Sequence, residues 1–236
     1  DLCASRGLGD VYKRQKLAKK IDGEIIGVDS RQIYNGIPIG TAQPNPSQLK
    51  EVPHHLIGFK KLSERISAGE YIELIDQKVD EIIQKNKSAI LCGGTGLYFK
   101  SLKEGIFEGS HTNENIRRRL EEEYELDKEK LFKTLQKIDP DYSKKVHINN
   151  KKRLIRALEV YESTGKPMSK NFDSLSKNSR YANDYYFVYL KMNNDFLHPR
   201  ILKRIKYMID DGMIDEVDEI ITVSYTHLRA HETHTN

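Results

Sequence analysis

The chain has 236 residues, of which 31% are charged and 37% hydrophobic, and its formal net charge at pH 7 is +4. This length suits one α/β domain, or one such domain with a sizeable insertion. No stretch reaches the roughly eighteen apolar residues of a membrane span, and residues 1–15 contain no apolar segment of a secretory signal. Cys3 and Cys92 form no disulfide framework, so we expect a reducing, cytoplasmic setting without a membrane.

Both ends of the sequence lack helical and strand periodicity. Residues 1–15 and 223–236 resemble translated sequencing-adapter sequence rather than native protein, and we expect neither to contribute to the fold. The second segment places His227 and His231 four residues apart, with His234 nearby, a spacing that could hold zinc on a helix. Because no pattern of carboxylates that could orient the histidine rings surrounds them, we expect no metal site there.

The first predicted elements are the end of a helix at 16–21 and a buried strand at 24–28. A turn and a proline-rich loop fill 35–53, and a helix follows from Ser67, where Ser67 and Glu70 fit a capping box. A strand at 88–92 and a glycine-rich turn lead into a helix from Leu97. A strand, a helix and a strand of these lengths indicate a right-handed parallel crossover.

From Asn113 to Gly165 the apolar spacing is helical throughout, with a break at Asp139-Pro140. A polar segment at 169–183, a strand at 185–192 and a closing helix at 199–221 follow. We therefore expect an α/β core over 16–110 and 184–222, with a helical insertion over 111–183. The closing helix carries apolar residues on one face: Ile201, Ile205, Met208 and Ile209.

Asp29 and the Gly93-Gly94-Thr95-Gly96 turn each follow a predicted buried strand. The carboxyl ends of strands line the ligand crevice of an open α/β sheet, so both should lie on one rim. Partial desolvation at such a position suits a carboxylate to act as a base, although a helix cap or a turn is equally compatible with the spacing. The turn offers backbone N–H groups and a hydroxyl to an anion, unless it is only a tight connection.

Basic residues are concentrated in two places. Arg200 and Arg204 lie four apart on a predicted helix and could clamp a diphosphate, although a solvated face is the commoner arrangement. His54-His55 has no third ligand at metal spacing, so we expect it to pack within a loop. The second group of basic residues lies between Lys144 and Arg156, a stretch without an acidic residue. It is compatible with binding of a phosphate backbone or with a solvated face, and its members are Lys144, Lys145, Lys151, Lys152, Arg153 and Arg156.

Six ordered blocks together resemble the tRNA dimethylallyltransferase (tRNA isopentenyltransferase) family. The resemblance runs from about Lys16 to Ile221, and its blocks are residues 29–34, 40–44, 53–56, 93–98, 153–160 and 164–167. It implies a fold similar to P-loop nucleotide kinases, which is a nucleotide-binding parallel sheet with helices on both faces, and an all-helical insertion. It also implies transfer of a dimethylallyl group from its diphosphate to N6 of adenosine 37, beside the tRNA anticodon.

The resemblance assigns roles to individual residues. Asp29 is the implied general base, Thr95 contacts the target nucleotide, and Arg200 is favoured over Arg204 near the diphosphate. The implied diphosphate-binding set is Gly93, Gly94, Gly96, Arg200 and Arg204. The implied tRNA-binding set is Asp29, Ser30, Arg31, Gln32, Thr95, Arg117, Lys152, Arg153, Leu154, Ile155 and Arg156. The implied partners are dimethylallyl diphosphate and the tRNA anticodon stem-loop, and the implied cofactor is Mg²⁺. The protein is expected to be a monomer.

The sequence departs from the family pattern in three places. It contains no phosphate-binding loop ending Gly-Lys-Ser/Thr, it has Asn150 where the family has Asp, and it has no counterpart of the later C-terminal helices. We therefore expect this polypeptide to be inactive or nearly so. Two other hypotheses stay open: prenylation of a free adenine nucleotide, and a nucleotide-kinase-like or non-catalytic RNA-binding protein. The basic helical insertion argues against a free nucleotide, which would need no such surface.

Overall fold

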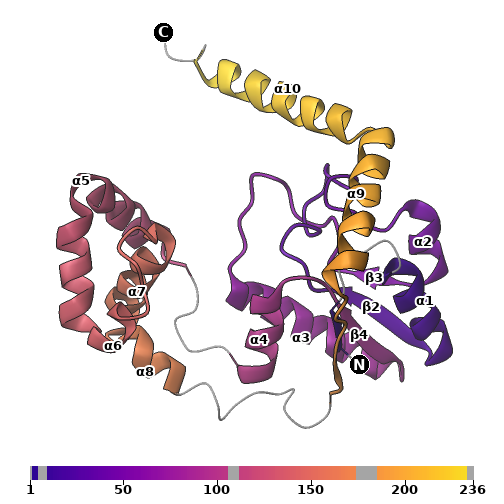
Figure 1. The fold of residues 1–236 in the computed structure, drawn as a ribbon, viewed down its shortest axis with the longest axis horizontal. Helices are drawn as coiled ribbons and strands as arrows, with labels where there is room; N and C mark the ends of the chain where they lie inside the picture. The colour runs from indigo at the N-terminus through magenta and orange to yellow at the C-terminus, as the bar shows by residue number, and fades with distance from the viewer. Residues whose placement is uncertain (1, 5–9, 106–111, 174–184, 233–236) are drawn as a thin grey trace. The chain divides into compact units, whose positions relative to one another are not determined.

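Figure 1 shows the computed structural model, which describes the backbone of residues 2–4, 10–105, 112–173 and 185–232. Side chains are described within 13–105, 112–171 and 185–222. The chain divides into two compact units. One comprises residues 1–65, 74–96 and 185–236, and the other comprises residues 66–73 and 97–184.

The first unit is built on a parallel sheet with the strand order β3-β2-β4-β1-β5. Strands β2 and β4 pair in register from Gly23 opposite Ser88 to Gly27 opposite Cys92, so both end at the same level of the sheet. The predicted α/β class with a parallel sheet is confirmed. The strands are β1 Leu2–Ala4, β2 Gly23–Gly27, β3 His54–His55, β4 Ser88–Cys92 and β5 Phe187–Tyr189.

Helix α1 (Asp10–Lys20) packs on β2 and β4. Ala18 of α1 joins Ile25, Ile90 and Cys92 of the sheet in one apolar cluster, to which Val52 also belongs. Cys92 is buried in this cluster, in keeping with its place in an apolar strand. These contacts fix the two strands whose carboxyl ends carry Asp29 and the glycine-rich turn.

Helix α3 (Ala68–Gln84) begins with the predicted capping box. The Ser67 amide donates to Glu70 Oε2 over 2.7 Å, and the Glu70 amide donates to Ser67 Oγ over 3.2 Å. Together these bonds satisfy amides that have no partner inside the helix. The chain then returns through β4 to helix α4 (Gly96–Glu104), as the crossover pattern predicted.

The expectation that both ends lie outside the fold was wrong, because both ends contain residues that form a strand or a helix. β1 pairs with β4 and β5, and α1, whose end was predicted at 16–21, begins at Asp10 within the stretch expected to lie outside the fold. Helix α10 (Met213–Glu232) likewise continues through the stretch from 223. A three-residue strand between two neighbours leaves no periodicity to detect, because its stability comes from pairing rather than from alternation.

Two loops predicted from composition contain short helices instead. Helix α2 (Pro46–Glu51) begins at Asn45, whose side chain forms a capping box with Gln48, and a proline stands at its start, where proline is tolerated. Helix α8 (Met168–Asp173) occupies the beginning of the segment predicted to be polar and irregular. The rest of that segment, 174–184, lies outside the described residues.

His54 and His55 form β3 rather than a loop. His55 Nε2 lies 2.7 Å from Glu24 Oε2, and Lys87 and Lys85 lie 3.1 and 3.6 Å from the same carboxylate. Burial raises the pKa of the Glu24 carboxyl, but hydrogen bonds from His55 and Lys87 outweigh burial and leave this pKa below its usual value. His55 therefore does more than pack within the protein, because it takes part with Lys85 and Lys87 in a network around the Glu24 carboxylate.

The predicted closing helix is two helices, α9 (Asn194–Asp210) and α10, which are separated at Gly212 with its φ of +98°. The apolar face predicted on α9 is present, but Ile201, Ile205 and Ile209 are 43%, 43% and 48% exposed. Within the described part of the chain, no helix is both long and apolar enough to cross a membrane.

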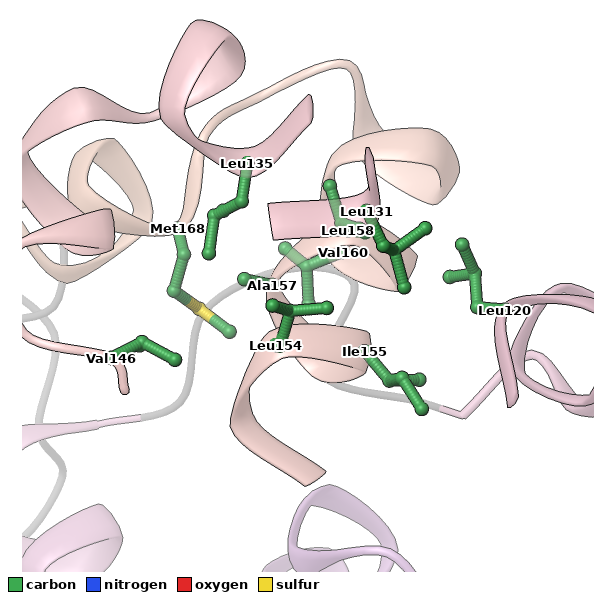
Figure 2. Packing of buried hydrophobic residues seen from close by; sticks show 10 residues of the cluster. All are labelled: Leu120, Leu131, Leu135, Val146, Leu154, Ile155, Ala157, Leu158, Val160 and Met168. Atoms are coloured by element: carbon green, nitrogen blue, oxygen red, sulfur yellow. The ribbon is translucent and has the colours of Figure 1, made fainter. Parts of the chain in front are cut away.

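The second unit is helical around a core of its own, as predicted (Figure 2). Apolar residues at helical spacing lie on both sides of Asp127, whose backbone is not helical and divides α5 (Glu114–Ile138) into two helical segments. Asp139 ends this helix and caps the next, and Gly165 caps α7 in the left-handed conformation. The helices completing this unit are α5 Glu114–Ile138, α6 Pro140–Ser143, α7 Lys151–Thr164 and α8. The core is formed by Leu120, Leu131, Leu135, Val146, Leu154, Ile155, Ala157, Leu158, Val160 and Met168.

Candidate active site and nucleic-acid interface

The loops that follow β2 and β4 are joined by backbone hydrogen bonds. The Val28 amide donates to the Cys92 carbonyl over 2.8 Å, and the Thr95 amide donates to the Val28 carbonyl over 3.3 Å. These bonds continue the strand pairing past the ends of the strands. The predicted rim, with Asp29 on one loop and the glycine-rich turn on the other, is therefore one connected structure.

Gly93 permits this close approach. A Cβ atom at Gly93 would lie 1.9 Å from the Val28 carbonyl oxygen and 2.8 Å from its Cα, distances that no side chain can have. Gly96 differs, because a Cβ there would meet nothing within 4 Å. Since Gly96 opens α4, the free amides of the helix N-terminus follow directly after the turn.

Thr95 connects the turn to the residue after Asp29. Its hydroxyl accepts a hydrogen bond from the Ser30 amide over 2.9 Å and lies 3.4 Å from Ser30 Oγ. The expected meeting of the two loops around Asp29 and Thr95 is thus present in the structure. Both residues are half-buried, so neither is closed off from a ligand at the rim.

Asp29 has one engaged and one available carboxylate oxygen. Its Oδ1 accepts from the Arg31 amide over 2.8 Å and from the Gln32 amide over 3.3 Å, which is an Asx-type turn. Its Oδ2 receives no hydrogen bond from any residue that the structure describes. The turn-forming and proton-accepting roles of Asp29 are therefore compatible, because each uses a different oxygen.

Gln32 and Arg31 differ in what they offer a ligand. The Gln32 side-chain amide donates to the carbonyls of Thr41 and Ala42 over 3.1 and 2.9 Å, so this group is engaged within the protein. Arg31 is exposed, and its side chain makes no ion pair with a described residue. The predicted RNA-reading stretch therefore contains one residue that organises the loop and one free cation.

Arg200 and Arg204 lie on α9, as the sequence predicted. Arg200 is exposed and Arg204 is half-buried, and among the described residues neither guanidinium has an acidic partner. No described contact joins either arginine to Asp29 or to the glycine-rich turn. Their role toward a diphosphate stays a prediction.

Two of the predicted RNA-binding arginines share a buried carboxylate in the helical unit. Arg117 Nη2 and Arg156 Nη1 lie 2.8 and 3.0 Å from Glu159 Oε2, while the Asn113 amide donates to Glu159 Oε1 over 2.8 Å. Glu159 is fully buried, whereas each arginine keeps about a quarter of its side chain exposed. Sequence reasoning missed Glu159, whose signal was an acidic residue inside an apolar helical run.

The first turn of α7 presents cations without an acidic residue. Lys152 and Arg153 are exposed, and neither has an ionic partner in the described ranges. Asn150 caps the helix by accepting the Arg153 amide, so the remaining amides and the side-chain charges both favour an anion. Leu154 and Ile155 are 0% and 3% exposed in the core, so their side chains are not available to RNA, and their place in the tRNA-binding set stays a prediction.

Sequence reasoning also missed Glu216 of α10, a buried carboxylate that accepts the amides of Ile39 and Gly40 over 2.7 Å each. Its signal in the sequence was only an acidic residue near the end of the predicted closing helix at 199–221. In the part of the chain that the structure describes, no group of three His, Cys, Asp or Glu residues could hold a metal ion.

Comparison with known proteins identifies the family. The family model described as IPP transferase matches residues 32–234. The tRNA dimethylallyltransferase of Thermotoga neapolitana is 37% identical over 211 residues, and that of Alkaliphilus oremlandii is 39% identical over 211 residues. Each match covers 89% of this chain, and the chain spans 68% and 67% of the two relatives.

Solved structures of similar fold agree with this result. A eukaryotic dimethylallyltransferase acting on tRNA matches with a TM-score of 0.84 and 26% identity over 96% of this chain and 56% of its own. The tRNA isopentenylpyrophosphate transferase of Bacillus halodurans matches with a TM-score of 0.59 and 32% identity over 94% of this chain and 69% of its own. The chain therefore belongs to the IPP transferase family, and it is similar in sequence and fold to the enzymes named above.

Proposed function

We propose that this chain transfers a dimethylallyl group from dimethylallyl diphosphate to N6 of an adenosine in tRNA, namely adenosine 37 of the anticodon stem-loop, at the low rate expected from its departures from the family sequence pattern. The observation that carries the proposal is the Ser30–Thr95 hydrogen bond of 2.9 Å, which holds the Asp29 loop against the glycine-rich turn. A proton acceptor and an anion-binding turn at one rim are what this transfer requires. The names of the similar proteins support the same reaction.

Asp29 supplies the base in this proposal. The N6 amine of adenine is a poor nucleophile, because its lone pair is delocalised into the ring. Removal of one N6 proton as the new C–N bond forms keeps charge from building up on the nitrogen. The unoccupied Oδ2 of Asp29 suits this role, since Oδ1 is held by the Arg31 and Gln32 amides and fixes the carboxylate.

The leaving diphosphate needs electrostatic stabilisation as its C–O bond breaks. The amides at the start of α4 support binding of that anion beside Thr95, and we assign Arg200 to it on the family resemblance. Mg²⁺ would neutralise diphosphate charge when bound to it. Because the described residues form no metal cage, no step is assigned to the ion.

The helical unit supplies RNA binding in this proposal. Exposed cations at the start of α7, together with Arg117 and Arg156 on buried Glu159, suit a phosphate backbone. The target adenine must leave the anticodon-loop stack, which costs a few kcal/mol, and contacts with the surrounding RNA can offset that cost. A free adenine nucleotide offers no such contacts.

The test uses the purified chain with labelled dimethylallyl diphosphate and Mg²⁺, with the protein in excess so that slow transfer is measurable. The acceptors are unmodified tRNA, the same tRNA with guanosine at position 37, and AMP. Label only in the tRNA with adenosine 37 supports the proposal. Label in AMP supports the nucleotide-prenylating alternative, and tRNA binding with no label in any acceptor supports the non-catalytic one.

A further inference from the structure

Glu216 joins α10 to a loop that lies 177 residues earlier in the chain at Ile39. Its Oε1 accepts the Ile39 amide over 2.7 Å, and its Oε2 accepts the Gly40 amide over 2.7 Å. Hydrogen bonds to a carboxylate are stronger than neutral ones, and Glu216 is only 9% exposed. The bidentate contact therefore fixes both the position and the orientation of these two peptide groups.

The segment that Glu216 holds, residues 37–43, is a compact loop. The Thr41 amide and hydroxyl both donate to the Ile37 carbonyl, over 3.2 and 2.6 Å, and the Ala42 amide donates to the Ile39 carbonyl over 2.9 Å. Ala42 has a φ of +52°, which is unfavourable for a residue with a side chain. A loop with this backbone needs contacts from outside to keep it in place.

The 37–43 loop is connected by hydrogen bonds to Asp29 of the candidate site, through Gln32. The Gln32 side chain donates to the carbonyls of Thr41 and Ala42, and the Gln32 amide donates to Asp29 Oδ1 over 3.3 Å. One continuous set of hydrogen bonds thus runs from the Glu216 carboxylate, through the loop, to the Asp29 carboxylate. Gly40 permits the contact, since a Cβ there would lie 3.1 Å from Glu216 Oε2.

We propose that Glu216 is a positioning residue for the transfer reaction. It touches neither substrate nor reacting atom in this account. Its carboxylate holds the 37–43 loop, the loop holds Gln32, and Gln32 holds the turn that presents Asp29. The proposal rests on the function proposed above for what the site does, but the contact itself can be tested independently.

The first test is amide hydrogen exchange in the Glu216→Gln variant of the chain. Glutamine keeps one acceptor oxygen, but it turns an NH₂ group toward the second amide. Exchange at Ile39 and Gly40 is expected to rise about tenfold or more, with a smaller rise at the Arg31 and Gln32 amides. Glu219→Gln, an exposed change on the same helix, is the matched control. Unchanged exchange at these four amides, or an equal rise throughout the unit, would overturn the proposal.

The second test is the single-turnover transfer rate at saturating tRNA. Glu216→Gln is expected to slow transfer about tenfold while the affinity for tRNA stays within about threefold, because a displaced base affects chemistry more than binding. Glu219→Gln should leave both unchanged. A loosened loop with an unchanged rate would refute the positioning role. Absence of transfer in the unsubstituted chain would count against the proposed function, and exchange at the Asp29 turn would still decide the role of Glu216.

Discussion

The Ser30 amide donates a hydrogen bond to the Thr95 hydroxyl over 2.9 Å, although the two residues are 65 positions apart in the sequence. This bond joins the loop after β2 to the loop after β4. It places the residue next to Asp29 against the turn that opens α4. A base and an anion-binding turn therefore share one rim because two parallel strands end at the same level and their loops are bonded to each other.

Thr95 can be tested through this bond. Thr95→Val removes the hydroxyl with little change in shape and leaves the half-buried Ser30 amide without its acceptor, at a cost of about 1 to 3 kcal/mol. We expect single-turnover transfer to fall about tenfold or more in Thr95→Val. Thr95→Ser keeps the hydroxyl and should stay within about threefold of the unsubstituted chain. Equal losses in the two variants would show that the hydroxyl is not the important group.

The two glycines of the turn make a matched pair for a stability measurement. Gly93→Ala forces a Cβ to within 1.9 Å of the Val28 carbonyl oxygen, so the loops must separate. We expect urea denaturation to show a loss of more than about 3 kcal/mol, the scale of severe overpacking.

Gly96→Ala meets open space at the start of α4, where alanine also favours the helix. Its unfolding free energy should be unchanged or raised by up to about 1 kcal/mol. If Gly93→Ala were as stable as Gly96→Ala, the close approach of the two loops would be refuted.

The buried Glu159 carboxylate should be essential to the helical unit. Glu159→Gln removes the negative charge with which Arg117 and Arg156 both pair, and breaking a buried ion pair in this way costs about 3 to 5 kcal/mol. We expect that loss in thermal or urea unfolding, together with weaker tRNA binding. Glu162 lies on α7 like Glu159, and its ion pair with Arg119 is more exposed. The control substitution Glu162→Gln should therefore cost less than about 1 kcal/mol. Similar losses in both variants would contradict the assigned role of Glu159.

His54 should make stability depend on pH. Burial lowers the pKa of the His54 imidazole to about 4, and its Nδ1 lies 2.7 Å from the Val52 carbonyl oxygen. Because the folded state resists protonation, the unfolded state binds the proton first as the pH falls below about 6.5. The stabilising contribution of neutral His54 is therefore fully present above pH 6.5 and is lost progressively toward pH 4.

The size of this effect is about 1 to 2 kcal/mol once partial exposure of the ring is allowed for. His54→Gln removes the titrating group, so its unfolding free energy should fall less between pH 6.5 and 4 than that of the unsubstituted chain. Parallel pH profiles of the two proteins, measured by urea denaturation, would contradict the assignment.

The sequence predicts the elements whose stability comes from their own pattern. Strands β2 and β4 are apolar runs, α3 carries its capping box, and the helical unit shows apolar residues at helical spacing. The rim could be predicted as well, because parallel strands bring their carboxyl ends together. β1 could not, because its three residues depend on pairing with strands far away in the chain.

The same distinction applies to site residues. Asp29 and Thr95 follow strands, and their neighbourhood was predictable. Leu154 was assigned to RNA as part of a motif, although its place on the apolar stripe of α7 puts it in the core. Glu159 and Glu216 could not be identified, since their importance comes from which distant amides and guanidiniums the fold brings to them.

The most direct test of the central claim is single-turnover transfer to tRNA by Asp29→Asn compared with the unsubstituted chain, with tRNA affinity measured in parallel. Asparagine can keep the turn through its oxygen but cannot accept the N6 proton. We predict that transfer falls by about 10² to 10⁴, the usual contribution of a general base, while tRNA affinity is unchanged. An unchanged transfer rate in Asp29→Asn would contradict the account.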